Sequence, residues 1–336
     1  MINKEIYGGG ILRRAIKGSN ILVVGGAGFI GSHLVDALIQ QGAHQVFVVD
    51  NLFLGKKENL ADAFAKGAVL FTEDAENYPR LEAIIEDNNI QIVFNLATKA
   101  LNYSFIDPRD AFITNVSVIG NLLEIQRRGK FETLCHFSSS EVYGTAIYEP
   151  MDEKHPYNPT TTYAGGKAAA DILLKTYVNM FGLDAFIVRP FNNYGPRQNS
   201  DPPLAGIIPI TCQRILNGEP PVIQGTGEQT RDFIYVMDTV DAVIKLYPIV
   251  EFGREVNISS QNQLTMISVI QQICQLLNYH GNIISKPARG ADVICHNSTN
   301  ALLCSLIYFQ PTKFADGLQQ TVDWYKHHLE KKTIIA

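Results

Sequence analysis

The stretch GGAGFIG at residues 25–31 decides the fold of this chain. It follows an apolar run at residues 21–24 and precedes apolar residues that recur at helical spacing as far as Ile39. Read from Gly25 the stretch is G-x-x-G-x-x-G, and read from Gly26 it is also G-x-G-x-x-G. A strand, a glycine turn and a helix in this order let backbone N–H groups approach a pyrophosphate closely. The alternative is a purely structural glycine turn in an unrelated α/β protein.

Further apolar runs alternate with helical stretches along the first part of the chain. They lie at residues 46–49, 68–71, 92–96, 133–137 and 185–188. An amphipathic helix is predicted from about Tyr163 to Phe181. This alternation is typical of a parallel sheet covered by helices on both faces. We predict an α/β fold: a Rossmann doubly wound parallel sheet of six or seven strands, with a smaller C-terminal substrate-binding α/β lobe.

The composition excludes several classes of partner. The chain has 336 residues, with 28 Lys and Arg against 33 Asp and Glu, a net charge of -5 and a pI near 5.9. It lacks the basic excess typical of proteins that bind nucleic acids or anionic membranes, so neither is expected as a partner. No apolar run is long enough to span a membrane, and no signal peptide is recognised. Five widely spaced cysteines without a C-x-x-C pair indicate a reduced, cytoplasmic setting.

A carboxylate follows the second predicted strand at the spacing of dinucleotide sites. Asp50 comes 19 residues after Gly31, where it can accept hydrogen bonds from the ribose hydroxyls of an adenosine. An Asp there also repels a 2′-phosphate, so NAD is favoured over NADP. Asp74 could bind the adenine amino group or simply cap the following helix. For Asp50 itself, a plain turn residue at the strand end is the alternative.

Two further groups of residues suggest chemistry. Tyr163 and Lys167 stand four residues apart on one face of the predicted helix, where an ammonium can lower the pKa of a phenol. Most such pairs are ordinary surface or packing residues. The strand at 133–137 ends on SSSEVYG, residues 138–144, at the edge where parallel sheets bind ligands. Hydroxyls there could bond a substrate oxygen and Glu141 could act as acid or base; alternatively, the serines cap the strand and Glu141 is solvated.

Together these motifs resemble the extended short-chain dehydrogenase/reductase family, in particular its nucleotide-sugar epimerases, dehydratases and decarboxylases. The resemblance runs from Ile21 to about Tyr325. It rests on GGAGFIG, VVDNL, FNLAT, SSSEVYG, YAGGK, RPFNNYGPRQ and TRDFIYVMD, in this order. It implies an NAD-dependent enzyme acting on a nucleoside-diphosphate sugar, and no metal.

The resemblance implies a role for each site residue. Tyr163 would take the proton of the sugar C4 hydroxyl while the C4 hydride passes to NAD, and Lys167 would bond the nicotinamide ribose and lower the tyrosine pKa. Ser139 would steady the C4 oxygen. NAD would be bound by Gly25, Gly28, Phe29, Ile30, Gly31, Asp50, Asn51, Asp74, Ala97 and Lys167. The substrate would be bound by Ser139, Ser140, Asn192, Arg231 and Arg289, of which the two arginines would hold the pyrophosphate. For Arg231 a structural salt bridge is the alternative.

Three features depart from the family pattern. Gly166, after Gly165, replaces the usual Ser or Thr before the lysine and weakens the helix by about 1 kcal/mol per glycine. Thr98 replaces the alanine that commonly follows NLA. The arm before Ile21 has no counterpart, so its role is open.

Every branch of the resembled family forms a 4-keto sugar, and the branches differ in the step after it. Glu141 occupies the place of the glutamate that removes the C5 proton in 4,6-dehydratases, although Ser140 replaces the Asp of the thymidine-diphosphoglucose enzymes. We predict foremost a nucleoside-diphosphate-hexose 4,6-dehydratase. The alternatives are a 4-epimerase of the UDP-glucose or UDP-N-acetylglucosamine type, a UDP-glucuronate decarboxylase, and a regulator that only binds NAD or a nucleotide sugar.

Domain boundaries and assembly can also be predicted. Prolines and glycines crowd the segment after Arg189, which marks the departure of the chain from the sheet. We predict an N-terminal arm at 1–20, an NAD-binding domain at 21–194 and roughly 233–260, and a nucleotide-sugar-binding lobe at 195–232 and 261–336. The resemblance also implies a homodimer formed through helices at about 108–127 and 163–181, although an apolar helix face alone does not separate an interface from a core.

Overall fold

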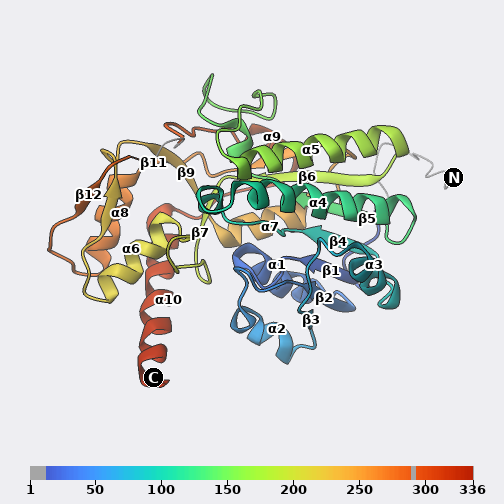
Figure 1. The fold of residues 1–336 in the computed structure, drawn as a ribbon, viewed down its shortest axis with the longest axis horizontal. Coiled ribbons are helices and arrows are strands. Elements are labelled where there is room, and N and C mark those ends of the chain that lie inside the picture. The colour runs from blue at the N-terminus through green and yellow to red at the C-terminus, as the bar shows by residue number, and fades with distance from the viewer. Residues whose placement is uncertain (1–12, 289–292, 336) are drawn as a thin grey trace.

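A computed structural model of the chain describes residues 13–288 and 293–335. Its central sheet has the strand order β10-β6-β5-β4-β1-β2-β3, and all neighbouring strands are parallel. The strands are β1 (Asn20–Val24), β2 (Gln45–Val49), β3 (Val69–Phe71), β4 (Ile92–Asn95), β5 (Thr133–Phe137), β6 (Asp184–Pro190) and β10 (Glu255–Ile258). The order reverses between β1 and β4, the position at which such sheets bind ligands. The predicted doubly wound parallel sheet is confirmed (Figure 1).

Helices cover both faces of this sheet. In β1, Ile21 and Val23 belong to one core and Leu22 and Val24 to the other, because alternate residues of a strand point to opposite faces. The first core is completed by α1 (Phe29–Gln40), α2 (Ala61–Ala65), α7 (Val236–Leu246) and α9 (Ala301–Leu306). The second is completed by α3 (Tyr78–Asp87), α4 (Pro108–Arg127) and α5 (Thr162–Phe181). Figure 1 shows α4 and α5 side by side, and they contact each other extensively.

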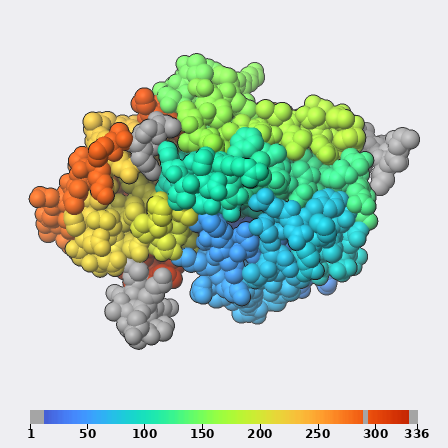
Figure 2. Space-filling model, viewed as in Figure 1, coloured from blue at the N-terminus to red at the C-terminus, as the bar shows by residue number. Residues whose placement is uncertain are grey.

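A smaller lobe follows the sixth strand of the chain and has a core of its own. Its strands are β7 (Asn192–Tyr194), β9 (Thr230–Tyr235) and β11 (Gln263–Thr265) in one sheet, and β8 (Val222–Gln224) and β12 (Ile284–Lys286) in another. Its helices are α6 (Ile207–Leu216), α8 (Met266–Leu276) and α10 (Phe314–Ile335). Figure 2 shows the yellow and orange segments of this lobe gathered at one end of the molecule. Within residues 13–288 and 293–335, no helix has the length and apolarity needed to cross a membrane.

The chain passes between sheet and lobe more than once. β9 pairs with β7 and β11 in the lobe, after which α7 and β10 return to the central sheet. α9 also contacts β10. We therefore propose the division into a sheet domain at 21–194 and about 233–260 and a lobe at 195–232 and 261–336, with α9 resting on the sheet domain.

The described part of the N-terminal arm is anchored by a buried arginine. Arg13 Nη2 lies 2.6 Å from Asp184 Oδ1 and donates to the carbonyl oxygen of Val250 at 2.9 Å. A further hydrogen bond runs from Arg13 to the carbonyl oxygen of Tyr247. The guanidinium also lies 4.7 Å from the centre of the Phe186 ring. Residues 13–19 are therefore tied to β6 and to the end of α7.

Replacing this arginine should destabilise the protein strongly. Arg13→Ala leaves the Asp184 carboxylate buried without its cation, and breaking a buried ion pair on one side costs about 3 kcal/mol or more. The free energy of unfolding measured in urea checks this. Arg14→Ala is the matched control, because Arg14 pairs with Glu132 in a half-exposed bridge worth about 0.5 kcal/mol. Equal losses in the two variants would contradict the anchoring role.

Candidate active site

The glycine turn leaves the start of α1 open. Gly25 has φ +79°, and a Cβ on it would lie 2.8 Å from the backbone nitrogen of Ala97. A Cβ on Gly31 would overlap the carbonyl oxygen of Gly25. Gly28 is the N-cap of α1 and supplies no side-chain hydrogen bond to the first turn, which also carries no acidic residue. The uncapped N–H groups and the helix dipole together suit the phosphates of a dinucleotide.

A methyl group on the turn should weaken binding of NAD. In Gly31→Ala the added carbon meets backbone, which cannot rotate away, so the turn must shift. We expect the dissociation constant for NAD, measured by titration calorimetry, to rise about tenfold or more. Gly120→Ala is the control, since a Cβ there meets only the Leu173 side chain at an ordinary 3.8 Å. An unchanged constant in Gly31→Ala would show that the turn does not hold the phosphates.

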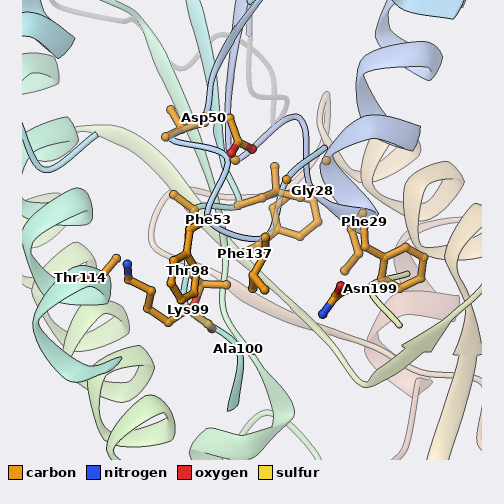
Figure 3. Close-up of a pocket in the computed structure, with 18 of the residues that line it drawn as sticks. Gly28, Phe29, Asp50, Phe53, Thr98, Lys99, Ala100, Thr114, Phe137 and Asn199 are labelled. Carbon is orange, nitrogen blue, oxygen red and sulfur yellow. Dashed lines mark hydrogen bonds between the residues drawn. The ribbon is translucent and has the colours of Figure 1, made fainter. Parts of the chain in front are cut away.

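A cavity of about 370 Å³ extends from this turn along the carboxyl ends of the strands. All residues predicted to bind NAD line it: Gly25, Gly28, Phe29, Ile30, Gly31, Asp50, Asn51, Asp74, Ala97 and Lys167. Asn51 Nδ2 donates to Asp74 Oδ2 at 2.9 Å, which joins two of them. Figure 3 shows Phe53, Thr98 and Lys99 on one side of this cavity and Phe29 and Asn199 on the other. The structure therefore brings the sequence-predicted cofactor residues together.

Asp50 is held by the backbone around it. Its carboxylate accepts hydrogen bonds from the N–H of Ala27 at 2.9 Å and of Leu52 at 2.8 Å. Burial raises the pKa of Asp50, and these hydrogen bonds oppose the shift. The side chain of Asp74 accepts a hydrogen bond from the N–H of Glu76. The N-cap of α3 is Asn77, so the alternative that Asp74 caps this helix is wrong.

Tyr163 lies at the junction of this cavity with a second one. The second cavity, about 630 Å³, reaches into the lobe, and both Tyr163 and Ser139 line the two cavities. Burial raises the pKa of Tyr163 to about 12, and hydrogen bonds with Ser139 and Thr98 oppose that shift. α5 starts beside it because Thr161 caps the helix by accepting from the N–H of Ala164 at 3.2 Å. A ligand in either cavity would therefore meet the phenol.

Lys167 is buried behind Tyr163 on the same helix face. Its Nζ donates to the carbonyl oxygen of Phe137 at 2.9 Å. Burial lowers the pKa of Lys167 to about 8. The ammonium form therefore still predominates at neutral pH.

Close packing between α4 and α5 explains why position 166 is a glycine, which the sequence alone does not reveal. A Cβ on Gly166 would lie 2.7 Å from the carbonyl oxygen of Phe112 on α4. The glycine therefore allows α4 and α5 to approach closely at the level of the Tyr163 and Lys167 pair. This close approach offsets the helix-weakening effect expected of a glycine there.

Glu141 is buried in the second cavity. It is 8% exposed, so the alternative of a solvated carboxylate is wrong. Ser139 accepts a hydrogen bond from the N–H of Glu141 at 3.3 Å and so caps the short helix η3 (Ser140–Tyr143). The side chain of Ser139 also forms a hydrogen bond with Tyr163. The negative charge of Glu141 raises the pKa of Tyr163. The acid or base candidate therefore lies near the phenol.

The predicted substrate residues converge on the second cavity with one exception. Ser139, Ser140, Asn192 and Arg231 line it. Arg231 donates to the carbonyl oxygens of Thr230 at 2.9 Å and Val293 at 2.7 Å, so its guanidinium is tied to the backbone of the lobe. Arg289 lies outside the described residues. In the described part of the chain, no cluster of three or more His, Cys, Asp or Glu could hold a metal ion.

Sequence reasoning missed several side chains that line the cavities. They are Phe53, Lys99, Arg197, Gln198, Arg214 and Lys286. Lys99 Nζ lies 4.0 Å from the centre of the Phe53 ring and 3.3 Å from Asp110 Oδ2. Gln198 ends the RPFNNYGPRQ motif, so the motif pointed to it. Arg214 on α6 and Lys286 on β12 follow no sequence pattern, and only the tertiary fold brings them to the same cavity.

Comparison with known proteins identifies the class. The model of the NAD dependent epimerase/dehydratase family matches residues 21–259. UDP-glucuronic acid decarboxylase 3 of Arabidopsis thaliana is 34% identical over 271 residues, which cover 77% of this chain and 74% of the relative. The structure of UDP-glucose 4-epimerase from Thermotoga maritima with UDP-glucose has a TM-score of 0.87 and 30% identity, covering 92% of this chain and 99% of that one. The dTDP-glucose 4,6-dehydratase of Streptomyces venezuelae, solved with NAD, has a TM-score of 0.88 and 26% identity, covering 93% and 98%.

The glycine turn borders the first cavity, and Tyr163 lies where this cavity meets the second one. This arrangement fits an enzyme that binds a dinucleotide in one cavity and its substrate in the other. This chain belongs to the NAD-dependent epimerase/dehydratase family. It is accordingly an NAD-dependent nucleotide-sugar modifying enzyme, of the group that contains 4-epimerases, 4,6-dehydratases and decarboxylases.

Proposed function

We propose that the protein is a nucleoside-diphosphate-hexose 4,6-dehydratase. The observation that carries this proposal is the burial of Glu141 in the second cavity, close enough to Tyr163 for its charge to raise the pKa of the phenol. A carboxylate at this place can remove a proton from a carbon next to a keto group.

Each side chain of the site has a separate role in this reaction. Tyr163 accepts the proton of the C4 hydroxyl, and Ser139 donates a hydrogen bond to the C4 oxygen. Lys167 supplies the positive charge that favours the phenolate. NAD, when bound, supplies the chemistry of taking up a hydride from the sugar and returning it at the end. Glu141 then removes the C5 proton, made acidic by the C4 ketone, and delivers it to the departing C6 hydroxyl so that water leaves. When the hydride returns at C6, C5 takes up a proton that has exchanged with the solvent.

The lobe side of the second cavity supports binding of a nucleoside diphosphate. Arg214, Arg231 and Lys286 line it, and forked guanidinium groups match phosphate oxygens. Asn192, from β7, donates to the carbonyl oxygen of Asp232 at 3.3 Å and lines the same cavity. We propose that these residues hold the diphosphate while the sugar extends toward Tyr163.

A 4-epimerase is the second candidate, and the likeness to the UDP-glucose 4-epimerase of Thermotoga maritima supports it. Such a reaction needs Tyr163 and Lys167 but no carboxylate at C5.

Product analysis in heavy water separates the candidates. The purified protein is incubated with UDP-glucose, UDP-N-acetylglucosamine, dTDP-glucose, GDP-mannose and UDP-glucuronate, and the products are followed by NMR and mass spectrometry. We expect one of the hexoses to lose water and to carry deuterium at C5. Inversion at C4 without exchange would refute the dehydratase and establish the epimerase. Release of carbon dioxide from UDP-glucuronate would refute both.

We further propose that the protein forms a homodimer through α4 and α5. Large apolar side chains are exposed on these two helices: Ile113, Ile172, Met180 and Phe181. Light scattering after gel filtration should give about twice the chain mass of 37.3 kDa. Ile172→Asp, at a side chain 56% exposed, should give the monomer without unfolding it. A monomeric wild type would contradict the proposal.

A further inference from the structure

A buried network of charges lies behind Lys167. Asp171, one turn further along α5, is completely buried, and it lines neither of the two cavities. Its Oδ2 accepts hydrogen bonds from Ser138 Oγ at 2.7 Å and from Arg189 Nη2 at 2.8 Å. Arg189 Nη2 also donates to Glu255 Oε2 at 2.7 Å. One carboxylate therefore joins α5 to β6 and to the residue that follows β5.

Two buried cations lie in this region, Lys167 and Arg189. Arg189 pairs with both Asp171 and Glu255, and Asp171 lies four residues from Lys167 on the same helix. Glu255 also pairs with the partly exposed Lys175 at 2.7 Å, so two cations already share it. Asp171 is the anion whose charge opposes the effect of burial on the pKa of Lys167. An ammonium held inside a protein without such a counter-charge tends to lose its proton.

The same carboxylate also fixes the end of β5. Ser138, which donates to Asp171, follows Phe137, whose carbonyl oxygen accepts from Lys167 Nζ at 2.9 Å. Ser139 comes next and bonds Tyr163. Three consecutive residues thus present the acceptor for Lys167, the link to Asp171 and the hydroxyl beside the phenol.

We propose that Asp171 is a positioning residue for the reaction: its buried carboxylate keeps Lys167 in the ammonium form and, through Ser138, holds the end of β5 against the Tyr163 phenol. The inference rests on the proposed function in one respect, the use of Lys167 as a cation beside Tyr163. Because Asp171 lines neither cavity, its role would be to act through Lys167 and Ser138.

The other groups that face Asp171 do not replace its charge. His136 Nε2 lies 3.8 Å from Asp171 Oδ1, and burial together with the charges of Lys167 and Arg189 lowers the pKa of His136 well below its usual range. Tyr157 donates to Asp171 Oδ2 at 3.3 Å, and burial raises its pKa. Both rings are therefore neutral at physiological pH.

Titration of Lys167 in an Asp171→Asn variant tests the inference. Asparagine keeps the shape of the side chain and an acceptor oxygen for Ser138 and Arg189, but it removes the negative charge. Lysine labelled at the ε-carbon is followed by NMR in the NAD-loaded protein, and loss of a signal in Lys167→Met identifies the resonance. Because losing an anion disfavours the ammonium, we expect the midpoint for Lys167 to fall by about one pH unit or more. Asp171→Glu should restore it.

Glu255→Gln is the matched control. It removes a carboxylate that bonds the same Arg189, whereas the anion that acts on the pKa of Lys167 is Asp171, so the midpoint should stay in place. An unchanged midpoint in a folded Asp171→Asn protein, or an equal fall in Glu255→Gln, would overturn the inference.

A measurement on the wild type covers the case in which Asp171→Asn does not fold. The carboxyl carbon of Asp171, labelled and followed by NMR, should shift at the pH where Lys167 loses its proton, and this step should vanish in Lys167→Met. A chemical shift that stays constant through the pH range in which Lys167 loses its proton would overturn the coupling. Neither measurement uses a nucleotide sugar, so failure of the dehydratase proposal and failure of this inference are distinguishable.

Discussion

Tyr163→Phe should lower turnover about a thousandfold while leaving NAD bound. The substitution removes one oxygen atom, the group that accepts the C4 proton, and general-base contributions of this kind are worth about 10² to 10⁴ in rate. Tyr163 lines the cofactor cavity, and phenylalanine retains its ring, so the affinity for NAD should change little. The rate constant with the substrate found in heavy water and the calorimetric affinity for NAD are the two measurements.

Tyr148→Phe serves as the control for this experiment. Tyr148 is exposed, its hydroxyl donates to Asp152 at 2.6 Å, and it lines neither cavity. The variant should keep full activity. Near wild-type turnover in Tyr163→Phe would show that another group takes the proton, whichever of the candidate reactions the enzyme performs.

Glu141→Gln should separate the first oxidation from dehydration. The amide keeps the size of the side chain but cannot take the C5 proton, so we expect dehydrated product to form about 10² to 10³ times more slowly. Tyr163, Lys167 and Ser139 are unchanged, so reduction of bound cofactor on addition of the sugar should persist. Absorbance of the reduced cofactor and NMR of C5 exchange report on the two stages separately.

Glu149→Gln is the matched control for the carboxylate. Glu149 is exposed, bonds Cys295 and Asn297, and lines neither cavity. Its replacement should leave both stages intact. If Glu141→Gln formed the dehydrated product at the wild-type rate, Glu141 would not be the C5 base.

The fold could be predicted from the sequence because its elements are encoded locally. The apolar run predicted at 133–137 is β5 to the residue, and the helix predicted from Tyr163 to Phe181 is α5, which begins one residue earlier, after its Thr161 cap. Burial of parallel strands on both faces makes their apolar runs continuous and easy to recognise. Short lobe strands such as β7 and β12 have three residues each and carry no such pattern.

The sequence could predict only those parts of the candidate site whose residues lie together in a short motif. The glycine turn, the Tyr163 and Lys167 pair and the Ser139 to Glu141 run lie in short segments whose chemistry follows from spacing. That Tyr163 and Ser139 lie between two cavities follows only from the folded chain. The exposure of Glu141 was open in the sequence, and the structure shows it buried.

The sequence by itself determined the alternation of strands and helices, the open glycine turn and the shared face of Tyr163 and Lys167, since each depends on residues a few positions apart. The tertiary structure alone decided the partners of Arg13 and the partners of Asp171, the carboxylate behind Lys167. Arg13 meets Asp184 from 171 positions away, and Ser138 meets Asp171 from 33 positions away. Contacts over such separations leave no periodic pattern in the chain, because they arise only when the core excludes water and buried charges must find their counter-charges.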